Sequence, residues 1–215
     1  MNQILIVSKT KMSKNHVCIG GIDLDNKLSV RLLNKDGYHE SMDECPYNIR
    51  EIWQIQYTKS YNPRPLPHSE DICVVNKKQR GILKDELSML DALKQVNFKI
   101  YNGSIRDTFE KKLKNTTSGT FYISEDDVPQ NSTCFWICDR DIARRDSFGK
   151  IKYRYQDETR QWGYDISFVG LDTNPIQIIP RGTLVRLSLA NWWSPQDSAG
   201  EKRCYLQLSG WYDLN

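Results

Sequence analysis

The sequence lacks a long apolar run, a strong excess of charge of one sign and a dense cluster of metal-ligating side chains. No stretch approaches the roughly 20 apolar residues that cross a bilayer. The first residues have neither the basic segment nor the long apolar core of a signal peptide. The 215 residues carry a net charge of +3, far from the balance of a typical duplex-DNA-binding protein. We therefore expect a cytoplasmic protein with no membrane segment.

The small net charge is unevenly distributed along the chain. Residues 1–115 contain 19 Lys/Arg and 14 Asp/Glu, a net of +5, whereas residues 116–215 contain 11 and 13, a net of −2. We therefore expect attraction to phosphate groups to come mostly from the first half.

The six cysteines are scattered, and without a secretion signal they do not indicate a disulfide framework. Cys134 and Cys138 lack the spacing of a zinc knuckle, and no second Cys or His pair follows them. Apolar residues 135–137 lie between them, so a buried strand with core thiols is the stronger interpretation. We expect no metal and no cofactor.

Alternating or branched apolar runs predict five strands in the first half, at residues 3–9, 16–24, 28–33, 51–57 and 71–75. Gly20 and Gly21 lie within the second of these strands, where paired glycines indicate a bulge or a sharp bend. Five strands with a bent early strand are typical of a small Greek-key barrel.

Two helical patterns follow. Residues 82–96 place Leu83, Leu87, Leu90 and Leu93 on one stripe. Residues 104–113 begin with a potential Ser104 cap and place apolar residues on one face. The second half then returns to strands at residues 120–123, 133–138, 150–155, 164–170, 183–190 and 203–211. The prediction is a mostly β chain of two barrels, residues 1–116 and 117–215, with the helical segment at the end of the first.

The last two predicted strands show the clearest alternation. Val185, Leu187 and Leu189 share one face, and Arg186 lies on the other. In residues 203–211, alternation predicts that Tyr205 and Trp211 share the face opposite the leucines. A half-buried antiparallel sheet follows from this pattern.

Two groups of residues could carry catalysis. His16 and Cys18 are two apart on a predicted strand and could form a base and a nucleophile. His68, followed by Glu70 and Asp71, could serve metal binding or proton transfer. Neither group belongs to a recognisable motif, and no glycine-rich phosphate loop is present. An accidental pair and a solvated turn are the stronger alternatives, so enzyme activity is left open and disfavoured.

Aromatic residues interleaved with basic ones offer a different chemistry. Tyr153 to Tyr164 contains one such cluster, and a second consists of Arg186, Trp192, Trp193, Arg203, Tyr205 and Trp211. Bases stack on aromatic rings, and arginine adds cation–π contact. The basic turn with Lys9, Lys11 and Lys14 could add phosphate contacts. Core packing of the tryptophans and solvation of the lysines are the alternatives.

The sequence resembles the dual OB-containing domain family of bacterial proteins at both ends. The resemblance lies in residues 4–12 (ILIVSKTKM), 181–193 (RGTLVRLSLANWW) and 203–212 (RCYLQLSGWY). It implies two OB-fold barrels and supplies no catalytic residues. OB folds bind oligonucleotides or oligosaccharides on one barrel face, although fold alone is a weak argument for function.

The prediction that follows is a non-catalytic module that binds single-stranded DNA or RNA. Bases would stack on Trp192, Trp193, Tyr205 and Trp211, and phosphates would contact Lys9, Lys11, Lys14, Arg186 and Arg203. The alternative is an accessory module of a bacterial defence or regulatory system that docks a protein partner or a small ligand. The modest net charge and the acidic second half favour that alternative.

Overall fold

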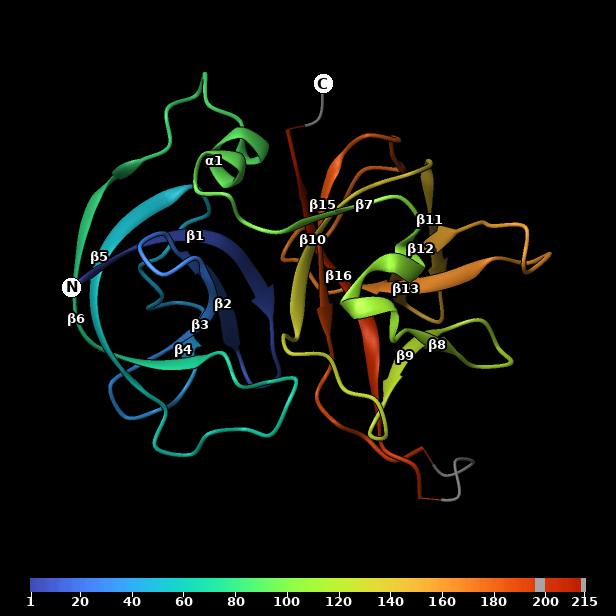
Figure 1. Ribbon diagram of the computed structural model, residues 1–215, viewed down its shortest axis with the longest axis horizontal. Coiled ribbons are helices and arrows are strands. Elements are labelled where there is room, and N and C mark those ends of the chain that lie inside the picture. The colour runs from blue at the N-terminus through green and yellow to red at the C-terminus, as the bar shows by residue number, and fades with distance from the viewer. Residues whose placement is uncertain (196–199, 214–215) are drawn as a thin grey trace. The chain divides into compact units, whose positions relative to one another are not determined.

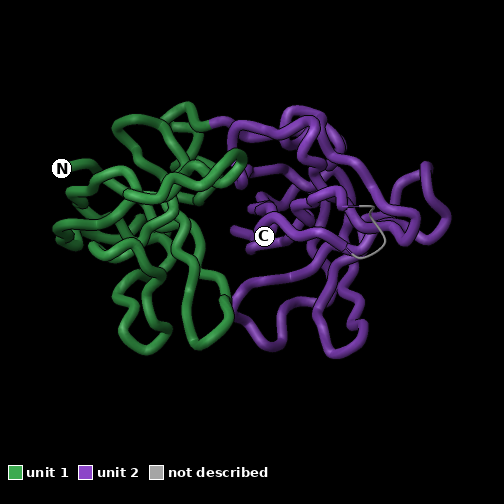
Figure 2. The backbone as a smooth tube through the Cα atoms, turned by 90° about the horizontal axis from the view of Figure 1, so that it is seen from below, with its two compact units in different colours: residues 1–98 green, residues 99–215 purple. Residues whose placement is uncertain are grey.

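The computed structural model describes residues 1–195 and 200–213. Within them the protein is mostly β, with one short α-helix (Figure 1). The chain divides into two compact units between Phe98 and Lys99 (Figure 2), whereas the sequence predicted a division after residue 116. The segment 99–116 contributes a strand and buried side chains to the second unit. The boundary therefore lies before this segment and not after it.

Unit 1, residues 1–98, is a closed five-stranded barrel. Its strands are β1 (Asn2–Lys11), β2 (His16–Asp23), β3 (Leu28–Leu33), β5 (Glu51–Lys59) and β6 (Asp71–Ile82). They pair in the order β1-β5-β6-β3-β2, and β2 pairs back to β1. β3 and β6 are parallel, and the other pairs are antiparallel. The short strand β4 (Glu40–Ser41) extends the sheet beside β2. All five strands predicted for this half are confirmed.

Alternation along these strands fills the barrel. The buried core of unit 1 consists of Ile4, Ile6, Val17, Ile19, Val30, Leu32, Tyr47, Trp53, Ile55, Ile72 and Val74. Within it, the Tyr47 and Trp53 rings meet edge to face with centroids 5.0 Å apart.

A bulge and a glycine close the barrel. The register between β1 and β2 shifts so that Ile6 lies opposite Gly21 and Ser8 opposite Gly20, which leaves Val7 as the extra residue. A Cβ on Gly21 would lie 2.6 Å from Cγ2 of Ile4. The irregularity expected at the paired glycines is therefore present, with the inserted residue on β1.

Unit 2, residues 99–215, is built on an open sheet. Its strands are β7 (Ile100–Asn102), β8 (Lys114–Asn115), β9 (Phe121–Ser124), β10 (Thr133–Ile137), β11 (Ile142–Ser147), β12 (Lys150–Tyr155), β13 (Tyr164–Phe168), β14 (Ile178–Ile179), β15 (Leu184–Leu189) and β16 (Arg203–Tyr212). The sheet runs β14-β11-β12-β13-β16-β15-β10-β7, and β9 joins the start of β16 with β8 at its outer side. β13 and β16 are parallel.

The core of unit 2 includes the apolar faces predicted for the last two strands. Val185, Leu187 and Leu189 of β15 pack with Leu206 and Leu208 of β16, and the two strands are antiparallel. The antiparallel pairing predicted here is confirmed, whereas β15 is buried on both faces from Leu184 to Leu187 and not on one face alone.

The helix predicted over residues 82–96 is wrong in its first half. β6 continues to Ile82 because its pairing with β5 reaches Glu51. Helix α1 covers only Met89–Gln95 and begins after Ser88, whose side chain accepts from the Asp91 N–H. Its buried residues are Met89, Ala92 and Leu93, so Leu93 alone of the predicted stripe lies inside the helix and is buried.

The helix predicted over residues 104–113 is also wrong. Two 3₁₀ turns, η1 (Ile105–Asp107) and η2 (Phe109–Lys111), take its place. Phe109, Glu110 and Lys111 have φ of 47°, 62° and 63°, which breaks any right-handed helix. Ser104 caps the first turn as expected. Ile105 and Phe109 are buried in the unit 2 core, so burial of apolar side chains shapes the segment without helical periodicity.

Candidate functional site

An aromatic cluster forms where β16 begins. Here β16 pairs with β9, so that Tyr205 lies opposite Tyr122. Trp193 lies opposite Arg203, and the two residues exchange backbone hydrogen bonds of 3.1 and 2.8 Å. We call Trp193, Tyr205, Tyr122 and Arg203 the aromatic cluster. Its members come from three segments, of which the one with Tyr122 lies about seventy residues before the other two.

The rings of the aromatic cluster lie in a row. The centroid of Tyr205 is 6.0 Å from that of Trp193 and 6.1 Å from that of Tyr122, with tilted planes in both pairs. The Arg203 guanidinium lies over the Tyr122 ring at 4.6 Å. Trp193 is 56% exposed, and Tyr205 is half-buried. The row therefore presents the exposed indole of Trp193, with the rings of Tyr205 and Tyr122 behind it.

Acidic and basic groups orient this surface. Nε and Nη2 of Arg203 donate to Oε2 of Glu201 at 2.8 and 2.6 Å. This hydrogen bond raises the pKa of Arg203 and lowers the pKa of Glu201. Two exposed lysines flank the cluster: Lys114 lies opposite Tyr122 on β8, and Lys202 precedes Arg203. The guanidinium is thus fixed in place, while the lysine ammonium groups face solvent.

The adjacent Trp192 and Trp193 have different roles. Trp192 is partly buried and packs against the unit 2 core, whereas Trp193 is exposed. The predicted pair of stacking indoles therefore reduces to Trp193, because consecutive residues of an extended segment point to opposite sides.

Trp211 does not join Tyr205 on one face, and that expectation is wrong. The register of β15 and β16 shifts at Ser209, so that Leu208 faces Leu187 and Gly210 faces Arg186. The extra residue reverses the alternation beyond it. The Trp211 ring instead packs near Tyr153 and Phe168, at centroid distances of 5.6 and 5.3 Å.

Arg186 is placed away from open solvent. It is 5% exposed, lies opposite Phe135 on β10, and its Nε has no hydrogen-bond partner among the described residues. The phosphate contact predicted for Arg186 stays a prediction, and its guanidinium is not part of the aromatic cluster.

The predicted basic turn belongs to unit 1. Lys9 donates to the Tyr47 carbonyl oxygen at 3.2 Å, while Lys11 and Lys14 are exposed. Lys14 takes a φ of 57° in the turn between β1 and β2. These lysines share no unit with Trp193, Arg203 and Tyr205, and their phosphate contacts stay a prediction.

The model of the dual OB-containing domain family matches residues 2–211. The chain belongs to this family. No curated protein and no solved structure matches it. The pairing order of unit 1, with parallel β3 and β6, is the five-stranded barrel that the family description implies. OB-fold domains commonly bind nucleic acids.

The His16–Cys18 region of this dual OB-containing domain protein lies on the outer side of β2. Val17 and Ile19 point into the barrel core, so His16 and Cys18 share the opposite face. The side chain of Arg31 on β3 pairs with that of Asp71 on β6. Among residues 1–195 and 200–213, no group of three or more His, Cys, Asp or Glu is arranged to hold a metal ion.

The second catalytic candidate is held in ion pairs. Oδ2 of Asp71 lies 3.5 Å from Nε of Arg64, and Arg31 binds the other carboxylate oxygen. His68 and Glu70 are buried beside it. Two arginines therefore occupy the carboxylate that a metal or a proton donor would need, and a chemical role for His68 stays a prediction.

His39 is a titratable group that the sequence analysis missed. Burial, followed by the charges of Arg31 and Arg64, lowers its pKa to about 4. The imidazole is therefore neutral at pH 7, beside two guanidinium groups. His39 lies in a connection between strands, where the sequence shows no alternation of apolar and polar residues. Only the fold brings its imidazole beside Arg31 and Arg64.

Three thiols of unit 2 are unreactive by their surroundings. Burial raises the pKa of Cys134, Cys138 and Cys204 to about 12 in each case. Cys138 donates its S–H to the Arg140 carbonyl oxygen at 2.7 Å. All six cysteines are free, and Cys134 and Cys138 are buried as the core thiols predicted from the residues between them.

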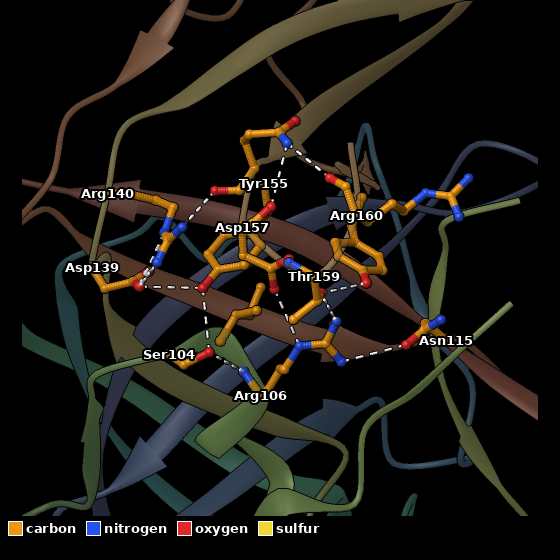
Figure 3. A network of polar contacts seen from close by, with 12 residues as sticks. Ser104, Arg106, Asn115, Asp139, Arg140, Tyr155, Asp157, Thr159 and Arg160 are labelled. Carbon is orange, nitrogen blue, oxygen red and sulfur yellow. Dashed lines mark hydrogen bonds and ion pairs between the residues drawn. The ribbon is translucent and has the colours of Figure 1, made fainter. Parts of the chain in front are cut away.

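A polar network ties residues 104–115 to the β12–β13 connection (Figure 3). Arg106 donates from Nε to Asp157 at 3.2 Å and from Nη2 to Thr159 at 3.0 Å. The hydroxyl of Tyr155 donates to Asp139 at 3.2 Å. Arg106 pairs with Asp157, and Arg140 pairs with Asp139, within the network, so we assign it a structural role. No helix in the described residues is long and apolar enough to span a bilayer.

Proposed function

We propose that this protein binds single-stranded DNA or RNA, without covalent chemistry, on the aromatic cluster of unit 2. The observation that carries the proposal is the ordered row formed by Trp193, Tyr205 and Tyr122, with Trp193 open to solvent. Unpaired bases stack on such rings, and each stacked base contributes about 1–3 kcal/mol. The proposal therefore concerns a strand whose bases are not already paired.

The charged groups around the row support the same ligand. Lys114 and Lys202 are exposed at its edges, where a strand stacked on Trp193 carries its phosphates. Arg203 is held by Glu201, so it needs little reorganisation when a base approaches. Lys114 and Lys202 can each neutralise one phosphate, which predicts a modest salt dependence.

One observation favours a second candidate, the docking of a protein partner. Glu201 neutralises Arg203 beside the Tyr122 ring, and exposed aromatic residues serve protein interfaces as well as bases. The two candidates differ in their response to salt and nuclease. Co-purification of a protein partner that survives nuclease treatment, with no oligonucleotide affinity, would support the second candidate and reject the first.

The direct test is a titration of fluorescently labelled single strands by the full chain. We expect binding that weakens with salt, to which Lys114 and Lys202 contribute about −1.4 of the log–log slope, at about −0.7 for each phosphate. Changing Lys114→Gln and Lys202→Gln should flatten the slope by about 1.4. Absence of affinity at low salt ends the proposal.

A further inference from the structure

The hairpin of β11 and β12 carries a fully exposed aromatic ring at its tip. Phe148 and Gly149 form the two-residue connection between Ser147 and Lys150, and Phe148 has no part of its surface covered. A Cβ added to Gly149 would meet nothing within 4 Å. Packing within the fold therefore gives no reason for a phenyl ring at this position.

Backbone geometry also opposes this residue. Phe148 has a φ of 51° and Gly149 one of 70°, and positive φ at both positions is the requirement of a type I′ turn. Asn-Gly is the favoured sequence of that turn, and a bulky residue at positive φ is an outlier. The chain keeps a ring that is both unpacked and strained.

Basic side chains cover one face of the same hairpin. Arg145 lies directly opposite Lys152, and Lys150 is the next residue on that face. None of the three makes an ion pair within the described residues. Like charges directly opposite each other destabilise a sheet. The other face is neutralised instead, because Arg144 binds both carboxylate oxygens of Asp146 at 2.8 Å.

We infer that the β11–β12 hairpin is a second nucleic-acid contact, in which Phe148 stacks on a base and Arg145, Lys150 and Lys152 contact the adjoining phosphates. The inference rests on the proposed function for its ligand, a single strand. It uses residues separate from the aromatic cluster, so each can fail alone. An exposed ring next to uncompensated cations is the combination that single-strand binding uses.

Other occupants fit the hairpin less well. Lysine is depleted at the centres of protein interfaces, whereas this face has two lysines and an arginine. An anionic membrane would attract the charges, but even one myristoyl chain holds a protein only marginally at a bilayer. One phenyl ring buries less apolar surface than that chain, while it matches one base.

Photocrosslinking tests the inference on the full chain. Single strands that carry 5-iodouracil are irradiated in complex with the protein, and the crosslinked peptides are mapped by mass spectrometry. We expect crosslinks at Phe148. Crosslinks at Trp193 or Tyr205 without any at Phe148 overturn the hairpin contact and leave the proposed function standing. Crosslinks at Phe148 alone support the hairpin and reject the aromatic cluster, and absence of binding and of crosslinks rejects both.

Affinity measurements give an independent readout. Phe148→Asn should weaken binding by about 5- to 150-fold, the loss of one stacked base. Because it creates the favoured Asn-Gly turn, the melting temperature should hold or rise, which separates binding from folding. The control Tyr61→Asn removes an exposed ring of unit 1 and should leave affinity unchanged.

The charges are tested by Lys150→Gln with Lys152→Gln, against Lys27→Gln with Lys35→Gln as a control at exposed positions of unit 1. The hairpin pair should flatten the salt slope by about 1.4, and the control pair should not change it. If Phe148→Asn abolishes flotation with phosphatidylserine vesicles and leaves oligonucleotide affinity intact, the inferred ligand is wrong.

Discussion

The strand pairings of unit 1 recur within the larger sheet of unit 2, but the first strand differs between the two units. In unit 1, β1 runs unbroken and pairs with β5 at its start and β2 along its remainder. In unit 2, β10 pairs with β15 and β11 pairs with β12. These two short strands together make the pairings that β1 alone makes in unit 1. The first solution closes a barrel, and the second leaves the sheet open.

Local chemistry explains the difference. Unit 1 bends its strand with a one-residue bulge opposite two glycines. Unit 2 interrupts the strand at Cys138, whose backbone N–H and C=O bond to Thr183 and Gly182 in place of a neighbouring strand. Asp139 and Arg140 then enter the polar network of Figure 3. The continuous strand β1 of unit 1 therefore depends on close packing at Gly21, while the break between β10 and β11 in unit 2 depends on hydrogen bonds of Cys138, Asp139 and Arg140.

The largest expected effect comes from Gly21→Val. Its Cβ would meet Ile4 at 2.6 Å inside the closed barrel, and overpacking of this kind destabilises by about 3 kcal/mol. Hydrogen exchange followed by mass spectrometry should show faster exchange in β1 and β2 and unchanged exchange in β16. Equal protection of β1 in both proteins would contradict the packing account of closure.

Asp23→Asn should have the next largest effect. Burial acts to raise the pKa of Asp23, but hydrogen bonds from Asn26, Tyr57 and Asn2 outweigh it, so the pKa lies below its usual value. A depressed pKa stabilises the fold above the unfolded value of about 3.9 and loses that contribution as pH falls.

At pH 7 we therefore expect Asp23→Asn to destabilise unit 1 by about 2 kcal/mol. The difference from the wild type should shrink as pH falls below about 4. Urea unfolding at pH 7 and pH 3 measures both values. A constant difference across this range would show that the charge of Asp23 plays no part.

A smaller effect is expected in unit 2 from Arg106→Met. The side chain is about one-third exposed, so solvent screens its pairing with Asp157, and we expect a loss of about 1 kcal/mol. Exchange should quicken in residues 104–115 and not in β1. Faster exchange in β1 instead would contradict the assignment of this network to unit 2.

Patterns within one strand were predictable, and pairings between strands were not. The alternation of β15 gave the face that packs in the core correctly, but Leu184 and Arg186 on the other face are buried as well, which the alternation did not indicate. Trp211 was misplaced, because no residue type marks the extra residue in β16. β11 was missed because Arg144, Arg145 and Asp146 break any apolar alternation, and its strand form depends on pairing with β12.

The candidate site shows the same limit. Trp193, Arg203 and Tyr205 were singled out from their composition, and the structure brings them together. Tyr122 was not, because its contact with Tyr205 depends on pairing between β9 and β16, strands separated by about eighty residues. Sequence reasoning finds residue types near each other along the chain, while the partner strand comes from the fold.

The most direct measurement of the central claim compares two tryptophans in the same unit. Trp193→Ala removes the open indole of the aromatic cluster, and Trp162→Ala removes a 67% exposed indole outside it. Affinity for a labelled single strand at one low salt concentration should fall about 5- to 150-fold for Trp193→Ala and hold for Trp162→Ala. Equal affinities for the two variants would contradict the claim that Trp193 is where bases stack.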